Sequence, residues 1–271
     1  MDAHDCLRVP FACKRVNDIV YGLNPVLEAL RSGRAQRILL ADGAKAATAA
    51  VAQLTAAAQV PIQRMSRRDL DGLLPGTNHQ GVAAEVRPFR YTSLDDLLSA
   101  AASREEPPLL LILDCIQDPQ NLGTLLRTAE AVGVHGVIVP RHRAAEITPA
   151  VERASAGAVE YLHVAQVTNL TQTALALKQR GLWIAGVEAA PSAVNYTQAS
   201  LTGPLAVVVG SEGRGISRLV RESCDFLVKI PMRGKITSLN AAVAGSVVLY
   251  EALRQRQAQP SDLARTRESA H

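Results

Sequence analysis

Residues 109–133 read LLLILDCIQDPQNLGTLLRTAEAVG, and this stretch decides the fold. Its apolar start predicts a buried strand, and Asp118-Pro119 predicts a turn directly before a helix. Helical spacing places one group of apolar side chains on a single face of that helix, namely Leu122, Leu125, Leu126 and Ala129. Arg127 therefore points away from the buried face, whereas Asn121 lies at the helix start, where free amide groups can meet a ligand.

Two simpler interpretations of this stretch remain open. Asn121 can serve only as a helix cap, and Arg127 can pair with Glu130 three residues later on a solvated face. Taken alone, the stretch favours these structural roles, so a functional role needs support from other segments.

The second half of the chain continues the pattern. Five further apolar runs follow the first, at 136–140, 162–167, 182–187, 204–210 and 226–231. Nearly continuous apolar runs bounded by turn residues are typical of a parallel sheet that is covered on both faces. Helices are predicted between the runs at 121–132, 148–155, 169–180, 214–224 and 238–256. The sequence therefore predicts an α/β domain over residues 107–256.

The first half alternates shorter elements. A helix is expected in YGLNPVLEALRSG, with Asn24 as its cap and Pro25 at its first position. Strands are expected at 37–41, 61–65 and 81–86, with helices at 44–58, 68–74 and 93–102. We interpret this as a small N-terminal α/β domain over 18–104, and SREEPP as the linker that follows it. The polar residues 257–271 are predicted to be disordered.

The composition is that of a protein that folds around its own apolar core. The 271 residues are 48% hydrophobic, and the four cysteines form no CxxC pair and have no histidine at ligand spacing. Neither a metal site nor a disulfide framework is indicated, which predicts a reduced, cytoplasmic protein. We see no leader at the N-terminus and no apolar run of about 20 residues, so no membrane span is expected.

The charge balance alone does not select a partner. The formal charge of +4 and pI near 9.0 are compatible with RNA binding, but the charge is spread along the chain and also suits an ordinary basic enzyme. Aromatic residues make up only 3% of the chain, which argues against a base-stacking platform. An RNA partner would be contacted mainly by arginine, lysine and backbone groups.

Two further loops follow predicted strands. VVVGSEGRGIS contains Glu212, which can bind polar groups, but it matches neither a dinucleotide-binding nor a Walker A pattern. IPMRGKITSLNAAVAG contains Ser238, a candidate helix cap, with Asn240 in the first turn of the helix. All three loops come at the carboxyl ends of strands, where open α/β sheets bind their ligands.

These three loops, in this order, resemble the three motifs of the SpoU/TrmH family of S-adenosylmethionine-dependent RNA ribose 2'-O-methyltransferases, in the SPOUT superfamily. RASAGAVEYL, between the first two, resembles the corresponding family segment. The N-terminal half, from VYGLNPVLEAL to HQGVAAEV, is similar to the substrate RNA-binding domain of the branch that modifies guanosine in large-subunit (23S) rRNA.

The resemblance implies a parallel sheet with a deep trefoil knot, and a homodimer with its sites at the subunit interface. It implies cofactor contacts at Gly210, Ile230 and Leu239. The catalytic positions of the family fall on Asn121, Arg127, Glu212, Ser238 and Asn240. Ala241 and Ala242 replace the Val-Ser pair that is usual after the SLN triplet, which removes any role for that serine.

The implied function is methyl transfer to a ribose 2'-hydroxyl of RNA without a metal. A guanidinium has a pKa above about 12, so we expect Arg127 to hold an RNA phosphate, although direct proton removal by it stays open. Ser238 and Asn240 would hold the ribose, and Glu212 the loop or nucleotide. Alternatives are an enzyme acting on tRNA or another rRNA nucleotide, including one conferring antibiotic resistance, and a noncatalytic ribosome-assembly protein. A Rossmann oxidoreductase is disfavoured.

Overall fold

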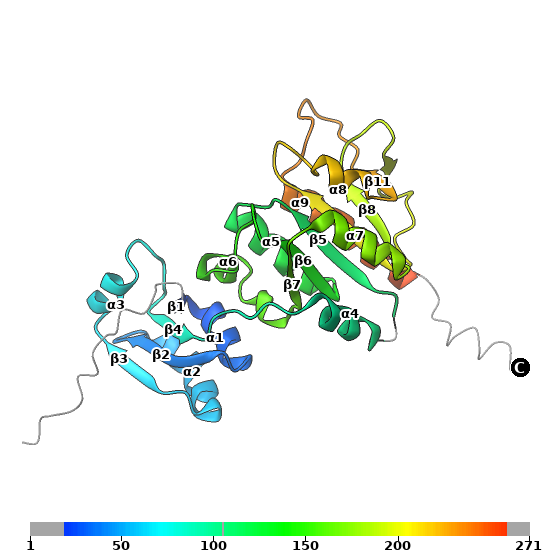
Figure 1. The fold of residues 1–271 in the computed structure, drawn as a ribbon. Helices are drawn as coiled ribbons and strands as arrows, with labels where there is room; N and C mark the ends of the chain where they lie inside the picture. The colour runs from blue at the N-terminus through cyan, green and yellow to red at the C-terminus, as the bar shows by residue number, and fades with distance from the viewer. Residues whose placement is uncertain (1–18, 105, 259–271) are drawn as a thin grey trace, which may run out of the picture. The chain divides into compact units, whose positions relative to one another are not determined.

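The computed structural model describes residues 19–104 and 106–258, and the chain divides into two compact units between Pro88 and Phe89 (Figure 1). This division lies before the SREEPP segment that we expected to be the linker. The reason is helix α4 (Leu94–Ala102), whose fully buried Leu97 packs in the core of the second unit. Most of the predicted disordered tail, residues 259–271, lies outside the described residues.

In its described residues, 19–88, the first unit is a four-stranded sheet with three helices. Its strands are β1 (Ile19–Tyr21), β2 (Ala35–Ala41), β3 (Ile62–Met65) and β4 (Val82–Val86), and its helices are α1 (Leu23–Arg31), α2 (Lys45–Ala58) and α3 (Arg67–Leu73). The strand order is β1-β4-β2-β3, in which β4 runs antiparallel to both neighbours and β2 runs parallel to β3. The predicted small α/β fold is confirmed, whereas the three-residue β1 was not expected.

The start of α1 differs from the prediction. Gly22, with φ 88°, occupies the cap position, so the expected cap at Asn24 is wrong. The Leu23 amide, the first of the helix, donates to Gln80 Oε1 at 2.9 Å. A tertiary contact therefore satisfies one of the free amides at the start of α1.

The second unit is built on a seven-stranded parallel sheet. Its strands are β5 (Leu109–Asp114), β6 (Gly136–Pro140), β7 (Val164–Val167), β8 (Trp183–Val187), β9 (Val194–Asn195), β10 (Leu205–Gly210) and β11 (Phe226–Lys229). The order is β7-β6-β5-β10-β8-β11-β9. All six expected strands are present, and β9, with two residues, was too short to predict.

Helices cover both faces of this sheet, as the apolar runs predicted. In addition to α4 they are α5 (Pro119–Ala131), α6 (Pro149–Ala154), α7 (Leu170–Gln179), α8 (Arg218–Glu222) and α9 (Ala241–Ala258), with a 3-10 turn at Ala158–Tyr161. Leu111 and Leu113 of β5 pack in one core with side chains of α5 and α9. Leu110 and Ile112 alternate with them and pack in the opposite core with α4 and α7.

Helix α8 is shorter than expected. It begins at Arg218 rather than near residue 214, because Gly213 and Gly215 have φ values of 78° and 65°, which no helix contains. Residues 214–217, which were predicted to be helical, belong to the loop before α8.

The strand order brings the three motif loops together. β10 lies between β5 and β8 and pairs with both in parallel, so the loops after β5 and β10 leave the same edge side by side. The chain after β11 returns through residues 230–240 to α9, which packs against α5 and β10. The trefoil knot implied by the resemblance stays a prediction.

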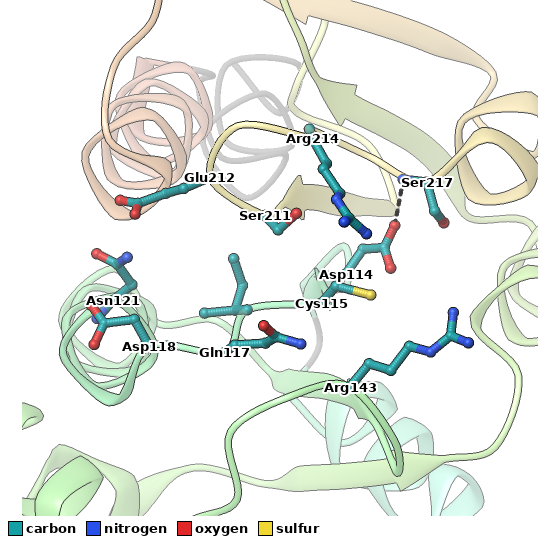
Figure 2. A pocket seen from close by; sticks show the side chains of 12 residues that line it. Asp114, Cys115, Gln117, Asp118, Asn121, Arg143, Ser211, Glu212, Arg214 and Ser217 are labelled. Carbon is teal, nitrogen blue, oxygen red and sulfur yellow. Dashed lines mark hydrogen bonds between the residues drawn. The ribbon is translucent and has the colours of Figure 1, made fainter.

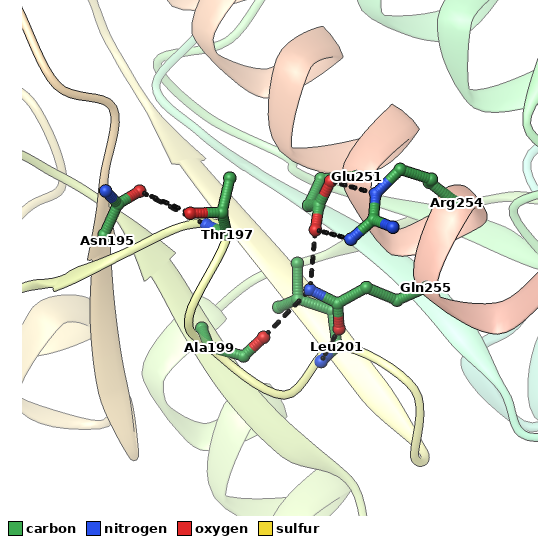
Figure 3. A network of polar contacts seen from close by, with 7 residues as sticks. All are labelled: Asn195, Thr197, Ala199, Leu201, Glu251, Arg254 and Gln255. Atoms are coloured by element: carbon green, nitrogen blue, oxygen red, sulfur yellow. Dashed lines mark hydrogen bonds and ion pairs between the residues drawn. The ribbon is translucent and has the colours of Figure 1, made fainter. Parts of the chain in front are cut away.

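A polar network ties the end of α9 to the segment before β10 (Figure 3). Gln255 donates from Nε2 to the Ala199 carbonyl at 3.0 Å, and its Oε1 accepts from the Leu201 amide at 2.9 Å. The Glu251 carboxylate accepts two hydrogen bonds from Arg254, at 2.7 and 2.8 Å, and one from Gln255. The bonds from Arg254 lower the pKa of Glu251 to about 2.

We expect Glu251→Gln to lower the free energy of unfolding at pH 7 by about 1 kcal/mol. The effect is modest because Arg254 is largely exposed, so solvent screens part of its interaction with the Glu251 carboxylate. The pKa of Glu251 is depressed in the folded state, so its contribution is present above about pH 4.5 and is lost as the pH falls towards 2. Urea unfolding at pH 7 and near pH 2 measures the difference. Glu222→Gln, in an exposed pair with Arg218, is the control and should change little. A difference that persists undiminished at pH 2 would assign the effect to packing.

Candidate functional site

Two adjoining cavities open at the carboxyl edge of the parallel sheet. Cavity A, of about 720 Å³, lies between the loops after β8, β10 and β11 and the start of α9. Cavity B, of about 550 Å³, lies between the loops after β5, β6 and β10 (Figure 2). The two share a wall made of Ser211, Glu212, Arg214 and Gly215.

The shared wall is a tight loop. The Ser211 amide donates to the Gly215 carbonyl at 3.0 Å, and the Gly215 amide donates back to the Ser211 carbonyl at 2.9 Å. The loop folds over Gly210 so closely that a β-carbon there would lie 2.2 Å from the carbonyl carbon of Gly215. Glycine at 210 is thus required by the backbone of the loop itself.

The resemblance to the SpoU/TrmH family implies that Gly210 contacts the cofactor. We therefore expect Gly210→Ala, which displaces the shared wall, to lower the affinity for the demethylated cofactor S-adenosylhomocysteine more than tenfold, with a loss of about 1–3 kcal/mol in the free energy of unfolding. Calorimetric titration and urea unfolding measure the two effects. Gly203→Ala is the matched control, since a β-carbon there meets nothing within 4 Å and should change stability by less than about 0.5 kcal/mol. Unchanged ligand affinity in Gly210→Ala would show that the loop shift does not reach cavity A.

The three motif loops meet at the side chain of Asn240. Its Oδ1 accepts from the amides of Ala242 at 2.9 Å and Val243 at 3.2 Å, so Asn240 caps α9. This fixes the orientation of the amide group, and its Nδ2 donates to Asn121 Oδ1 at 2.9 Å and to Glu212 Oε1. Asn240 therefore joins α5, the β10 loop and α9. We call this set of three side chains the Asn240 junction.

The junction corrects two expectations about helix caps. Ser238 does not cap α9, because the helix begins at Ala241 and Asn240 holds its free amides. Asn121 does not cap α5 either, since the Asp118 carboxylate accepts from the amides of Gln120 at 3.2 Å and Asn121 at 3.3 Å. The Asn121 side chain is thereby free to contact Asn240.

Seven of the eight predicted site residues line the cavities. Those lining cavity A are Gly210, Glu212, Ile230, Ser238, Leu239 and Asn240. Asn121 lines cavity B, where Glu212 is also exposed. Their individual roles stay predictions.

Arg127 is the exception. It is exposed on α5 and lines neither cavity. It lies six residues after Asn121, a rotation of about 240° around the helix, so it points away from the Asn240 junction. The alternative pairing with Glu130 is not formed, and across the described ranges Arg127 has no hydrogen bond or ion pair.

The polar groups of cavity B include Asp114 and Cys115. Asp114 Oδ2 accepts from the Ser217 amide at 2.6 Å, which ties the end of β5 to the start of α8. Burial, followed by the neighbouring Asp114 carboxylate, raises the pKa of the Cys115 thiol. The raised pKa disfavours the thiolate, which is the nucleophilic form of the side chain.

Several charged residues of the cavities had no predicted role, among them Glu188, Arg143 and Arg214. Glu188, after β8, lines cavity A and accepts from Arg221 Nη1 at 3.0 Å. Arg143 follows β6 and lines cavity B, and Arg214 lines both cavities. The available signal was their position directly after apolar strands, where ligand-binding loops occur.

Neither a metal centre nor a membrane span is found in the part of the chain that the structure describes. No three His, Cys, Asp or Glu side chains among these residues gather in a way that could hold a metal ion. None of the described helices is both long and apolar enough to cross a bilayer.

Comparison with known proteins agrees with this architecture. Residues 108–250 match the SpoU rRNA methylase family, and residues 19–92 match the RNA 2'-O ribose methyltransferase substrate-binding domain. The chain belongs to the SpoU rRNA methylase family. Its predicted family, α/β fold, enzyme class and S-adenosylmethionine cofactor are confirmed.

Individual members of the SpoU family resemble the chain over most of its length. It is 44% identical over 246 residues, 89% of this chain and 96% of the relative, to the 23S rRNA (guanosine-2'-O-)-methyltransferase RlmB of Pseudomonas syringae. It is 44% identical over 242 residues, again 89% and 96%, to YacO of Bacillus subtilis, provisionally assigned as a TrmH family tRNA/rRNA methyltransferase. The crystal structure of the SpoU methyltransferase AviRb from Streptomyces viridochromogenes with AdoMet superposes with a TM-score of 0.73 at 26% identity, covering 89% of this chain and 91% of AviRb.

Proposed function

We propose that this protein methylates the ribose 2'-hydroxyl of a guanosine in 23S rRNA. The observation that carries the proposal is the Asn240 junction, which brings one polar side chain from each motif loop to the boundary of two cavities. The choice of target is supported by the likeness to RlmB, which extends over both units of the chain. The first unit, which matches the substrate-binding domain, would recognise the RNA.

Cavity A has the chemistry to hold S-adenosylmethionine. Ile230 and Leu239 offer apolar surface for the adenine, and the Gly210 backbone lies at the same wall. Glu188 and Glu212 provide carboxylates that suit a sulfonium and an ammonium group, and Arg214 and Lys229 provide cations that suit the carboxylate of the same ligand. When bound, the cofactor supplies the electrophilic methyl group.

The residues of the chain orient the acceptor and stabilise its charge. Ser238 and Asn240 would hold the ribose at the boundary between the cavities, and Glu212 would keep the shared wall in place through its bond to Asn240. Holding two reactants in line supplies up to roughly 7–11 kcal/mol in the best cases. The 2'-hydroxyl proton would pass to an RNA phosphate or to water, because Arg127 is too basic to accept it.

The position of Arg127 supports a dimeric enzyme. Arg127 lies beside Thr128, whose hydroxyl is 2.8 Å from that of Ser246 on α9. The same side of α9 exposes Val243 and Tyr250, at 47% and 54% of their surface, one above the other at a spacing of seven residues. Burying this face against a second copy would cover the apolar side chains and bring Arg127 to the partner's RNA. Light scattering at micromolar protein tests this, and a monomeric mass would contradict it.

Methyl transfer to purified RNAs tests the function. Labelled S-adenosylmethionine is incubated separately with unmodified 23S rRNA, 16S rRNA and tRNA, and any 2'-O-methyl nucleotide is mapped by nuclease digestion. Label at one guanosine of 23S rRNA is expected. Label in tRNA or at another rRNA nucleotide, including one where methylation confers antibiotic resistance, would overturn the target. Absence of label despite cofactor binding would point to a ribosome-assembly intermediate as the substrate, or to the noncatalytic ribosome-assembly alternative. We place the reaction in the cytoplasm, where ribosomal RNA is modified.

A further inference from the structure

Cavity B contains two arginines for which the cofactor and the reacting groups give no role. Arg143 enters it from the loop after β6 and Arg214 from the loop after β10, with the end of β5 between them (Figure 2). Neither guanidinium has an ion pair or hydrogen bond to any residue that the structure describes. Both therefore have free donors facing a common space.

The carboxylates of the same cavity each accept hydrogen bonds from the protein. Asp114 accepts from the Ser217 amide, and Asp118 accepts from the first amides of α5. Glu212 accepts from Asn240. These bonds hold the carboxylates in place, whereas the guanidinium groups of Arg143 and Arg214 keep unused charged donors, which suit an anion.

The backbone of cavity B has an uncommon conformation at two positions. Cys115 and Arg143 have φ values of 59° and 62°, in the left-handed region that residues with a side chain seldom occupy. Both line cavity B. The surrounding structure has to maintain these conformations, which fixes the paths of the loops after β5 and β6 at the cavity.

We propose that cavity B binds a nucleotide of the substrate RNA, with Arg143 and Arg214 holding its phosphate. This inference rests on the proposed function and extends it. The arginine fork matches the oxygens of a phosphate with two parallel hydrogen bonds. A volume of about 550 Å³ is within the usual range of small-ligand sites. Since Asn121 lines cavity B and binds Asn240, the sugar of this nucleotide would lie at the junction, next to the methyl group in cavity A.

The test compares Arg143→Gln with Arg141→Gln. Arg141 is exposed in the same loop but lines neither cavity, so both variants lose one charge and differ in position. Binding of unmodified 23S rRNA is measured over a series of KCl concentrations. Arg143→Gln is expected to raise the Kd by roughly ten- to a hundredfold and to reduce the slope of log K against log salt by about 0.7–0.9. Arg141→Gln should stay close to the parent. The affinity for S-adenosylhomocysteine should not change in either variant, because Arg143 is absent from the lining of cavity A.

Further variants keep the result interpretable. Arg143→Lys retains the charge but not the fork, so partial recovery of RNA affinity is expected. If Arg143→Gln does not fold, Arg214→Gln repeats the RNA measurement. Equal RNA affinity and salt slope in Arg143→Gln and Arg141→Gln would overturn the proposal. A second outcome would also overturn it: binding of inorganic phosphate depends on Arg143, but RNA affinity does not. The site would then bind a free anion and not RNA. If the proposed function is wrong, the parent protein will transfer no methyl group to RNA. The RNA-binding comparison is independent of that result, because it requires no turnover.

Discussion

Replacing Arg127 with alanine will lower methyl transfer by roughly 10²- to 10³-fold, the usual loss when a group that stabilises developing charge is removed. The side chain is exposed and unpaired within the described ranges, so the free energy of unfolding should stay within about 0.5 kcal/mol of the parent. Affinity for S-adenosylhomocysteine should not change, because Arg127 lines neither cavity. Single-turnover rates at saturating RNA measure the effect. Glu130→Ala, on the same exposed side of α5, should retain the parental rate, and a parental rate in Arg127→Ala would contradict the role.

The same variant can show in which subunit Arg127 acts. If it serves the partner's site, a mixed dimer of Arg127→Ala and Asn240→Ser chains contains one intact site, formed by Asn240 of the first chain and Arg127 of the second. Mixing the two inactive proteins after partial unfolding should then restore about a quarter of the parental activity, since half of the dimers are mixed and each has one intact site. If Arg127 serves its own chain, every site lacks one group and no activity returns.

The strands were predictable because their burial is continuous. Every residue of β5 and β10 is buried, so the apolar runs in the sequence coincide with the strands. β1 and β9 were not predicted, because strands of three and two residues are too short to show a periodic pattern. The helix caps were misplaced at Asn24 and Ser238, since the free amides at these helix starts are held by Gln80, far along the chain, and by Asn240.

The candidate site was predictable only in part. The motif loops could be found from residue patterns, but their meeting depends on β10 lying between β5 and β8, a long-range order that local patterns do not specify. Arg143 was missed for the same reason. A single charged residue after a strand does not indicate a binding site, and only the folded structure shows that Arg143 and Arg214 line the same cavity. The bond between Asn121 and Asn240 spans 119 residues and likewise has no local signal.

Asn240 carries two separable functions, and two substitutions can distinguish them. Serine preserves a side-chain oxygen that caps α9 but removes the donors to Asn121 and Glu212, whereas alanine removes both. We expect Asn240→Ala to be less stable than Asn240→Ser by about 1 kcal/mol, the value of the cap. In both variants the free energy of unfolding should fall by a further ~1–3 kcal/mol, because Asn121 Oδ1 is buried and loses its donor.

Activity should fall about equally in the two variants, by roughly 10²-fold, because the junction positions all three loops and a shift of about 1 Å at a reacting group has an effect of that size. Urea unfolding and single-turnover methylation measure the two properties separately. Asn169→Ser is the matched control, since Asn169 caps α7 by accepting from the Gln172 amide at 3.0 Å and lines neither cavity. It should retain both stability and rate. If Asn240→Ser methylates at the parental rate while Asn240→Ala does not, the cap alone is what the active site requires, and the bonds to Asn121 and Glu212 have no part in catalysis.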